Sequence, residues 1–475
     1  MTDRTTTHFR GRHYEADHIT GPVPFLNPTT RLLPLHQPQA EEQPGRDQQQ
    51  TSPQHPPAAD GHENGEPGRK QSASSPDLTN ATRAAHPHNN SSGGIYHIWH
   101  SRDNRKGRHA LALTTSAAAS AASTATTAVS GHHQPRPTTT ARATLQGIAR
   151  MLLRYPVWDV SYDVAAVFTL GSVVWVLNGF FVLLPTTDPA ATAWWPGESA
   201  WGGGVSAAVG ASIFEFGSVL LMLEAVNENR ADCFGWALEE ALGDHGGGGG
   251  GVGGLVLRRE KGWCRHHHRR KEAFLTGKGA GVGDGKDEVD NKTSATGRRW
   301  TWWPSWYELR THYFRDIGFL ACLSQMIGAT VFWISGFTGL PQVLGTLTVP
   351  AENGIFWLPQ VVGGTGFIIS SWLFMLETQP NWHTPAPRTL GWHIGFWNLI
   401  GAIGFTLCGA LGFASGSSEA CETASLWSTF IGSWAFLVGS IIQWYESLDK
   451  YPVTVVDRKA VGAGESSSSG VLEKI

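Results

Sequence analysis

The chain contains few cysteines, and their positions do not suit disulfides or a zinc site. It has five cysteines in 475 residues and no Cys-x-x-Cys pair. Cys322 and Cys408 fall within long apolar segments, and Cys421 is alone on its side of the predicted membrane. A lone cysteine has no intramolecular partner, so the sequence predicts no disulfide framework. It has no spaced set of histidines and cysteines that would specify zinc, and no bound metal or cofactor is expected.

Signatures of catalysis are missing as well. The sequence has no nucleophile–base arrangement, no phosphate-binding loop and no set of intramembrane histidines. Membrane enzymes that act on lipids usually need such a cluster of reactive side chains. We therefore expect that the protein is not an enzyme.

Lysine and arginine are absent from six apolar segments, and no segment alternates apolar and polar residues with a period of two. The missing alternation excludes a membrane β-barrel. Each apolar segment has roughly 21–24 residues, enough at about 1.5 Å per residue to cross a hydrocarbon core of about 30 Å. The sequence therefore predicts an all-α membrane protein whose six transmembrane helices cover residues 163–184, 204–226, 317–340, 355–376, 392–414 and 426–446.

Basic residues are also missing from three of the loops that join these helices. Residues 185–203, 341–354 and 415–425 contain no lysine or arginine, and all 36 basic residues lie in the other loops and toward the two chain ends. Positive charge is enriched on the cytosolic side of membranes, so both termini are expected in the cytosol. The helix lengths leave the host membrane open.

Four further segments lie outside the predicted helices. Residues 1–144 are rich in proline, histidine, glutamine, serine and threonine, and are expected to be disordered. Residues 145–162 predict an amphipathic helix at the membrane interface. Residues 227–316 are expected to form a cytosolic loop, and residues 447–475 a cytosolic tail.

The 227–316 loop contains a polyglycine stretch, a basic cluster and a tryptophan-rich segment. The basic cluster is interpreted either as a patch for anionic lipid headgroups or as a solvated linker. Tryptophan beside arginine next to a membrane helix favours an interfacial anchor, so no nucleic-acid partner is expected. The residues that would contact lipid headgroups are Arg258, Arg259, Lys261, Arg265, Arg269, Arg270 and Lys271.

One pattern occurs three times in the apolar region with the same spacing. The second helix of each predicted hairpin has glycine, phenylalanine and serine at intervals of four residues, and then glutamate six residues later. Six unrelated helices would not share such offsets, so the sequence predicts three repeated antiparallel hairpins at residues 163–226, 317–377 and 392–446. The second helices contain Gly210, Phe214, Ser218 and Glu224; Gly363, Phe367, Ser371 and Glu377; and Gly432, Phe436, Ser440 and Glu446; the first helices contain Gly171, Trp175 and Gly179; Gly328, Phe332 and Gly336; and Gly401, Phe405 and Gly409.

The glycine, aromatic and serine positions are interpreted as helix-packing residues. Residues four apart form one ridge on a helix, and small residues allow close approach of helices in lipid. Counted from the cytosolic ends, Gly171 is expected level with Ser218, and Trp175 level with Phe214. Three hairpins of the same orientation indicate pseudo-threefold symmetry about the membrane normal.

The repeated pattern that ends in glutamate resembles the second helix of the YrhK-like domain, a two-helix membrane unit. The likeness is strongest at residues 357–360 and 363–377. The membrane part of the chain as a whole resembles an uncharacterised group of fungal multi-pass integral membrane proteins. The resemblance implies a topology and no known activity.

Glu215 is the outstanding polar residue, because it lies near the centre of the second predicted helix. An ionised carboxylate at that depth costs at least a few kcal/mol, so Glu215 is expected to be protonated or paired. The available partners are neutral: Asn178, Gln325, Asn398 and Gln443. The interpretation is either a proton- or cation-responsive site or a hydrogen bond that joins two helices.

Glu224, Glu377 and Glu446 recur at the cytosolic end of each second helix. A carboxylate there opposes the helix dipole, so each is expected to meet a cation. Arg315 and Arg388 are the predicted partners because they lie at the cytosolic entry of neighbouring helices. The three glutamates form either a collar of interfacial salt bridges or a cation-attracting ring at a pore mouth.

Two classes of function remain. The first is a non-enzymatic membrane scaffold or interaction protein with cytosolic segments for partners or lipids. The second is a transporter or channel for a small solute, an ion or protons that uses Glu215 in the helix bundle. A solute path normally needs several polar groups that face one cavity, and the sparse intramembrane polarity favours the scaffold.

Overall fold

The computed structural model describes residues 19–34, 95–114, 138, 140–188, 190, 195, 197–235, 237–238 and 300–456. Within these ranges, six helices are long and apolar enough to cross a membrane, as the sequence predicts. Their central parts are α4 (Val160–Thr187), α5 (Gly204–Val226), α9 (Ile317–Thr338), α12 (Leu358–Glu377), α13 (Leu390–Gly412) and α14 (Glu419–Leu448). The short elements around them are η4 (Ala231–Cys233), α8 (Trp306–Thr311), η5 (Tyr313–Arg315), α10 (Pro341–Leu344) and η7 (Ser415–Ser417).

Two of the long helices start with a wider turn than an α-helix. The π-helix η3 (Glu198–Gly203) precedes α5, while α11 (Val349–Glu352) and the π-helix η6 (Asn353–Trp357) precede α12. Side-chain caps fix the start of other helices. Asp159 accepts a hydrogen bond from the Ser161 amide, and Ser418 accepts one from the Cys421 amide. These caps lie outside the apolar segments, so α4 and α14 begin earlier than predicted from hydropathy.

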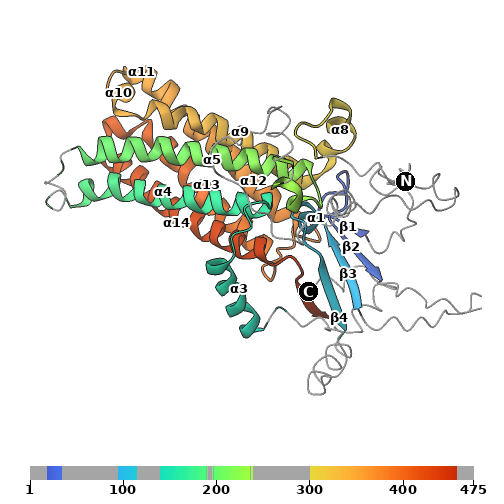
Figure 1. Ribbon diagram of the computed structural model, residues 1–475. Coiled ribbons are helices and arrows are strands. Elements are labelled where there is room, and N and C mark those ends of the chain that lie inside the picture. The colour runs from blue at the N-terminus through green and yellow to red at the C-terminus, as the bar shows by residue number, and fades with distance from the viewer. Residues whose placement is uncertain are drawn as a thin grey trace, which may run out of the picture. The chain divides into compact units, whose positions relative to one another are not determined.

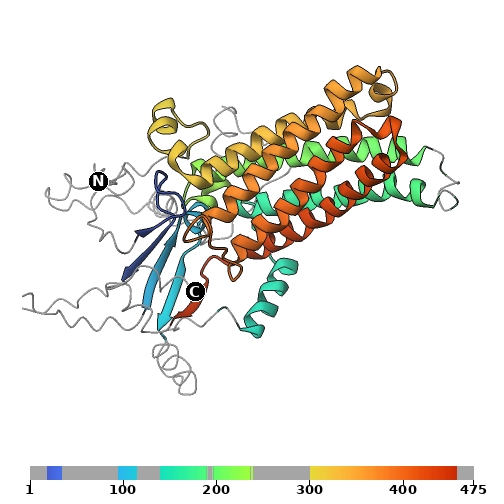
Figure 2. The ribbon, with the colours of Figure 1, turned by 180° about the vertical axis from the view of Figure 1, so that it is seen from behind.

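The six helices form a closed ring. Each helix packs against the next one along the chain, and α14 packs against α4. Figure 1 and Figure 2 show the long helices side by side from opposite directions.

An aromatic layer fills the centre of this ring, with one ring from each helix. Its closest pair is Trp175 and Phe405, whose ring centroids lie 4.9 Å apart. Other pairs also cross the bundle, such as Phe214 with Phe436 at 5.6 Å. Edge-to-face packing of this kind favours aromatic pairs. The layer consists of Trp175, Phe214, Phe332, Phe367, Phe405 and Phe436.

The register within the hairpins differs from the predicted one by about one helical turn. A Cβ atom at Gly171 would lie 2.6 Å from the ring of Phe214, and a Cβ at Gly210 would lie 2.9 Å from Trp175. Gly171 therefore lies opposite Phe214, where Ser218 was expected. The cause is steric, because each ring fills the space that the missing glycine side chain leaves on the facing helix.

The same two kinds of contact recur around the ring. The glycine early in α12 or α14 also packs against the facing helix: Gly432 lies beside the ring of Phe405, whereas Gly363 lies against the Gly328 carbonyl and the Cβ and backbone nitrogen of Phe332. The second glycine of α4, α9 or α13 instead faces the preceding helix of the ring. These contacts pair Gly179 with Phe430, Gly336 with Ala211, and Gly409 with Gln360.

A five-stranded sheet lies beside one end of the helices and corrects one prediction. Its strands are β1 (Ile19–Thr20), β2 (Thr30–Pro34), β3 (Ile95–His100), β4 (Ala110–Thr114) and β5 (Val453–Val456), in that spatial order. Only β4 and β5 pair in parallel. The prediction of disorder for residues 1–144 is wrong at 19–34 and 95–114. Each strand is too short to be stable alone, but the sheet joins them to a strand that follows α14.

An interfacial helix, α3 (Ala141–Leu153), precedes α4. The side-chain oxygen of Thr140 caps it, and it ends before the predicted boundary at residue 162. It exposes Leu145, Ile148 and Leu152. Its glycine Gly147 lies against the ring of Tyr445, so α3 adjoins the end of α14.

Candidate functional site

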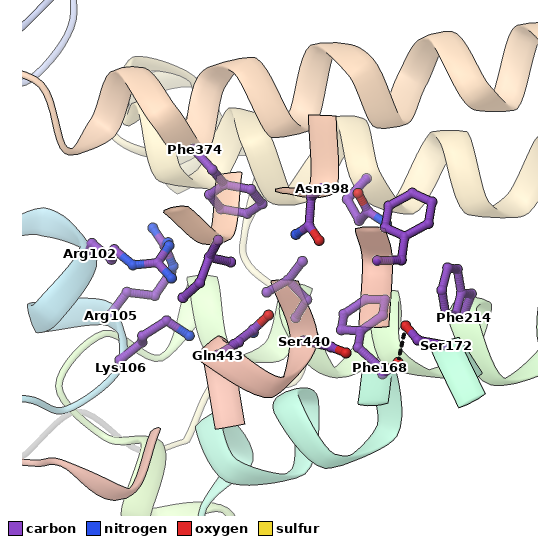
Figure 3. A pocket seen from close by; sticks show the side chains of 14 residues that line it. Arg102, Arg105, Lys106, Phe168, Ser172, Phe214, Phe374, Asn398, Ser440 and Gln443 are labelled. Carbon is purple, nitrogen blue, oxygen red and sulfur yellow. Dashed lines mark hydrogen bonds between the residues drawn. The ribbon is translucent and has the colours of Figure 1, made fainter. Parts of the chain in front are cut away.

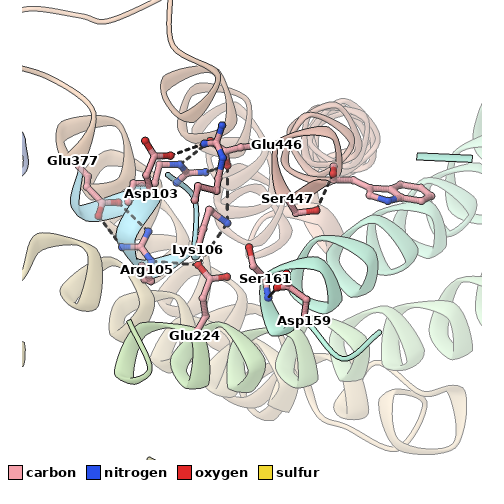
Figure 4. A network of polar contacts seen from close by, with 12 residues as sticks. Asp103, Arg105, Lys106, Asp159, Ser161, Glu224, Glu377, Glu446 and Ser447 are labelled. Atoms are coloured by element: carbon pink, nitrogen blue, oxygen red, sulfur yellow. Dashed lines mark hydrogen bonds and ion pairs between the residues drawn. The ribbon is translucent and has the colours of Figure 1, made fainter. Parts of the chain in front are cut away.

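The residues that bind the three glutamates come from the segment 101–108, which links β3 to β4. This segment consists of the short helix α1 (Ser101–Arg105) followed by Lys106, Gly107 and Arg108. Gly107 has a φ of 62°, a left-handed conformation that glycine adopts without strain, and it turns the chain back into β4. The segment lies at the end of the ring where α5, α12 and α14 finish, as Figure 4 shows.

Two of the three glutamates form bidentate ion pairs with this segment. Arg102 donates to Glu446 from Nε at 3.2 Å and from Nη2 at 2.7 Å. Arg105 donates to Glu377 from Nη1 at 2.7 Å and from Nη2 at 2.9 Å. The planar guanidinium matches a carboxylate in this geometry, which makes such pairs strong and directional.

Glycines at the start of two helices make room for the arginines. A Cβ atom at Gly391, in the first turn of α13, would lie 2.7 Å from Nε of Arg102. A Cβ at Gly318, in the first turn of α9, would overlap the guanidinium of Arg105. The glutamates project from α12 and α14, and these glycines open the path to them.

Glu224, on α5, has a different environment. It is fully buried, and neither of its carboxylate oxygens accepts a hydrogen bond from the described residues. Its cationic neighbours are Arg105, with Nε at 3.5 Å, and Lys106, with Nζ at 3.6 Å. The pairing is therefore electrostatic, without the geometry of the other two sites.

Charges in this buried cluster balance. Four basic side chains, Arg102, Arg105, Lys106 and Arg108, face four acidic ones, Asp103, Glu224, Glu377 and Glu446. All eight are at most 9% exposed. Removing one partner would leave an uncompensated buried charge, which typically costs about 3–5 kcal/mol.

The pKa values of the basic residues reflect this burial. Burial alone lowers the pKa of Arg102, but the carboxylate of Glu446 reverses the effect and raises it above its ordinary value. The pKa of Arg105 is raised well above its ordinary value because Glu377 outweighs burial. Burial lowers the pKa of Lys106, which Glu224 only partly offsets. Both arginines therefore remain charged, while Lys106 holds its proton less tightly than they do.

The predicted cation partners of the glutamates are wrong. Arg315 and Arg388 take part in none of the ion pairs between described residues. The requirement for a cation at the end of each second helix was the correct part of the argument, but the cations come from a segment expected to be disordered. Two short apolar runs on either side of 101–108 were the signal that could have indicated a strand–helix–strand unit there.

A central cavity lies between the aromatic layer and the 101–108 segment (Figure 3). Its volume is about 40 Å³, measured over the positions open to the centre of a water molecule. The residues that line it are Arg102, Arg105, Lys106, Phe168, Ser172, Phe214, Leu221, Gln325, Phe374, Ile394, Asn398, Phe436, Ser440 and Gln443.

Of the predicted intramembrane site, the structure brings together only Gln325, Asn398 and Gln443, which all line this cavity. Glu215 lies elsewhere, half-buried between α5 and α9, and its Oε1 accepts a hydrogen bond of 3.0 Å from Thr330. Asn178 lies toward the opposite end of the bundle and donates to the Gly203 carbonyl at 2.6 Å. The predicted grouping around Glu215 is therefore wrong, because Glu215 lies between α5 and α9, whereas these three amides line the cavity.

The basic cluster at 258–271, which was predicted to contact lipid headgroups, lies outside the described residues. Within the described ranges, no group of three histidine, cysteine, aspartate or glutamate side chains could hold a metal ion.

No match to the chain was found among protein-family models, curated proteins or solved structures. The resemblance to YrhK-like hairpins therefore stays a prediction, and the candidate site is defined by geometry alone.

Proposed function

We propose that the protein is a non-enzymatic membrane scaffold, in which a closed six-helix bundle binds the N-terminal part of the chain and presents it, together with the C-terminal tail, on one membrane face. The observation that carries this proposal is the 101–108 segment, which pairs at once with glutamates from α5, α12 and α14. The parallel pairing of β4 with β5 supports it further. The segment 101–108 and the strand that follows α14 thereby meet at the same end of the bundle.

The packed centre of the bundle favours a scaffold over the alternative, a transporter or channel. Six aromatic side chains meet across the ring, and the largest exposed fraction among them is 6% for Phe436. Glu215, on which the transport hypothesis depends, lies outside the cavity and bonds to Thr330. These two facts support the scaffold over the transporter, because a solute path needs polar groups that face one cavity.

The proposal includes three repeated hairpins and a cytosolic location for both termini. Matching glycine–ring contacts in the first and third pairs of helices, Gly171 with Phe214 and Gly401 with Phe436, support the repeat, and in the second pair Gly328 meets the backbone of the facing helix instead. Absence of basic residues from the loops at the far end supports the orientation. The exposed apolar side chains of α3 and the basic cluster at 258–271 suit contact with anionic lipids of the cytosolic leaflet.

Cleavage of the chain between β4 and α3 tests the scaffold role. A specific protease site is inserted near residue 130, and the purified protein is cut in detergent. The N-terminal fragment is expected to stay with the wild-type bundle and to dissociate from the Glu377→Gln, Glu446→Gln double variant. Dissociation from the wild-type bundle would refute the proposal.

Flux in reconstituted vesicles separates the scaffold from the transporter. The scaffold predicts no proton or ion flux above that of empty vesicles, in wild type and in Glu215→Gln alike. Wild-type flux that Glu215→Gln abolishes, and that the exposed-site control Glu419→Gln retains, would establish the transporter instead.

A further inference from the structure

The central cavity has no part in a scaffold, yet six of the fourteen residues that line it are basic or amide residues. The aromatic layer closes one side of it, and the side chains of the 101–108 segment close the other (Figure 3). A void inside a bundle of apolar helices is normally lined by apolar groups and stays empty. This one is lined by basic and amide side chains as well as by aromatic and aliphatic ones.

Three amide side chains that line the cavity have no hydrogen-bond partner among the described residues. Gln325, Asn398 and Gln443 make no hydrogen bond to any described residue. Nζ of Lys106 is likewise buried without a hydrogen-bond partner in that part of the chain, although it lies 3.6 Å from Glu224. Gln443 is buried, as is Nζ of Lys106, whereas Gln325 and Asn398 are partly buried. Buried polar groups are nearly always hydrogen-bonded, so these groups indicate a ligand or water between them.

The charges around the cavity select the sign of that ligand. Its lining contains three basic side chains, Arg102, Arg105 and Lys106, and no acidic one. The hydroxyls of Ser172 and Ser440 donate to backbone carbonyls, so the N–H groups are the donors left for a ligand. Such a set suits an anion and disfavours a cation.

The volume limits the size of the anion. A water molecule needs about 10–15 Å³ on the same measure, so the cavity holds roughly three waters, or one small anion with a water. Phosphate esters and lipid headgroups exceed this space, and sulfate would bring two negative charges into it. An anion with a single charge adds the least uncompensated charge beside the cluster, which is already balanced.

We propose that the central cavity is a binding site for a small monovalent anion of the size of chloride, held by Lys106 together with the amides of Asn398, Gln443 and Gln325. The bound anion satisfies the donors that the protein leaves unpaired. It also stabilises the charged form of Lys106, whose pKa burial lowers. It thereby strengthens closure of the bundle by the 101–108 segment.

Thermal unfolding of the full-length protein at fixed ionic strength tests this site. Chloride is exchanged for gluconate, which is too large for the cavity, and tryptophan fluorescence reports the unfolding temperature. The wild-type Tm is expected to rise by about 2–4 °C for each tenfold increase in chloride above the Kd. Bromide and nitrate should replace chloride, whereas sulfate should not.

Variants assign the effect to the cavity. Gln443→Met and Asn398→Leu approximately keep the side-chain volume and remove hydrogen-bond donors. Each should raise the Kd for chloride, taken from the dependence of Tm on chloride, at least tenfold. Gln360→Met is the matched control, because Gln360 is a buried glutamine that does not line the cavity. It should keep the wild-type dependence.

Equilibrium dialysis with radioactive chloride gives a readout that does not depend on stability. One chloride per chain is expected for the wild type and for Gln360→Met. Any of three results would overturn the proposal and indicate a cavity filled by water only. These are no bound chloride, a wild-type Tm that is the same in chloride and gluconate, or a Tm that depends on chloride in both cavity variants as it does in the wild type.

Discussion

Neutralising Glu446 is expected to release the 101–108 segment from the helix bundle. Glu446 accepts two hydrogen bonds from Arg102 and one of 3.1 Å from Arg108, and it is 1% exposed. In Glu446→Gln these two arginines stay buried with the loss of a shared carboxylate. Breaking a buried ion pair on one side typically costs about 3–5 kcal/mol. Because each 1.4 kcal/mol is a factor of ten, the open population rises by roughly one hundred- to several thousand-fold.

Limited proteolysis with trypsin measures this population. Trypsin cleaves after lysine and arginine, and the segment has four such sites, all buried in the closed protein. Cleavage at these sites is expected to accelerate in Glu446→Gln in proportion to the open population. The control is Glu422→Gln, an exposed carboxylate on the same helix, which should be cut at the wild-type rate.

A double variant separates loss of the pair from loss of packing. Replacing both partners by Arg102→Met and Glu446→Met leaves neither charge of the pair buried, and Arg108 keeps its 2.6 Å contact with Asp103. Protection against trypsin should recover largely toward that of the wild type, since apolar replacements of buried ion pairs are often neutral. Equal cleavage of Glu446→Gln and Glu422→Gln would refute the reasoning.

Three other substitutions test the packing, the pH dependence and the role of Glu215. Gly328→Ala places a Cβ 2.8 Å from a backbone carbonyl of the facing helix. It should destabilise the bundle by about 1–3 kcal/mol in denaturant unfolding. Gly354→Ala is the control and should not, because a Cβ there would have no neighbour within 4 Å. Burial and the nearby acids raise the pKa of Asp316 from 3.8 to about 6. Between these two pH values the folded state retains a proton that the unfolded state releases, so the stability falls as the pH rises. Asp316→Asn keeps the helix cap, and its Tm advantage over wild type should be absent at pH 3.5 and positive above pH 6.5; a constant difference would contradict this. Glu215→Gln retains an acceptor for the Thr330 hydroxyl and should change the unfolding free energy by less than about 1 kcal/mol; a larger loss would show that the carboxylate itself is needed.

The transmembrane helices were predictable because hydropathy and length are local properties. Predicted and observed ends agree closely wherever the apolar run and the helix coincide, as at Val226 and Ile317. Caps such as Asp159 and Ser418 moved other ends outward. The register within each hairpin was less predictable, because it depends on which side chain fills the space beside a glycine on another helix.

The 101–108 segment was not predictable from its composition. A short run with four basic residues is normally a solvated surface. Its burial depends on three glutamates that are more than a hundred residues away in sequence, at positions 224, 377 and 446. The glutamates themselves predicted an unknown cation, and only the fold identifies it.

Amide hydrogen exchange of residues 100–109 in the full-length protein tests the central claim most directly. Amides of Lys106 and Arg108 donate to the carbonyls of Arg102 and Asp103 at 3.1 and 2.8 Å, and the side chains around them are buried. Peptides that cover this segment should exchange as slowly as the ends of α12 and α14, and faster in Glu446→Gln. Exchange at the rate of an unstructured peptide, with the helices still protected, would contradict the account.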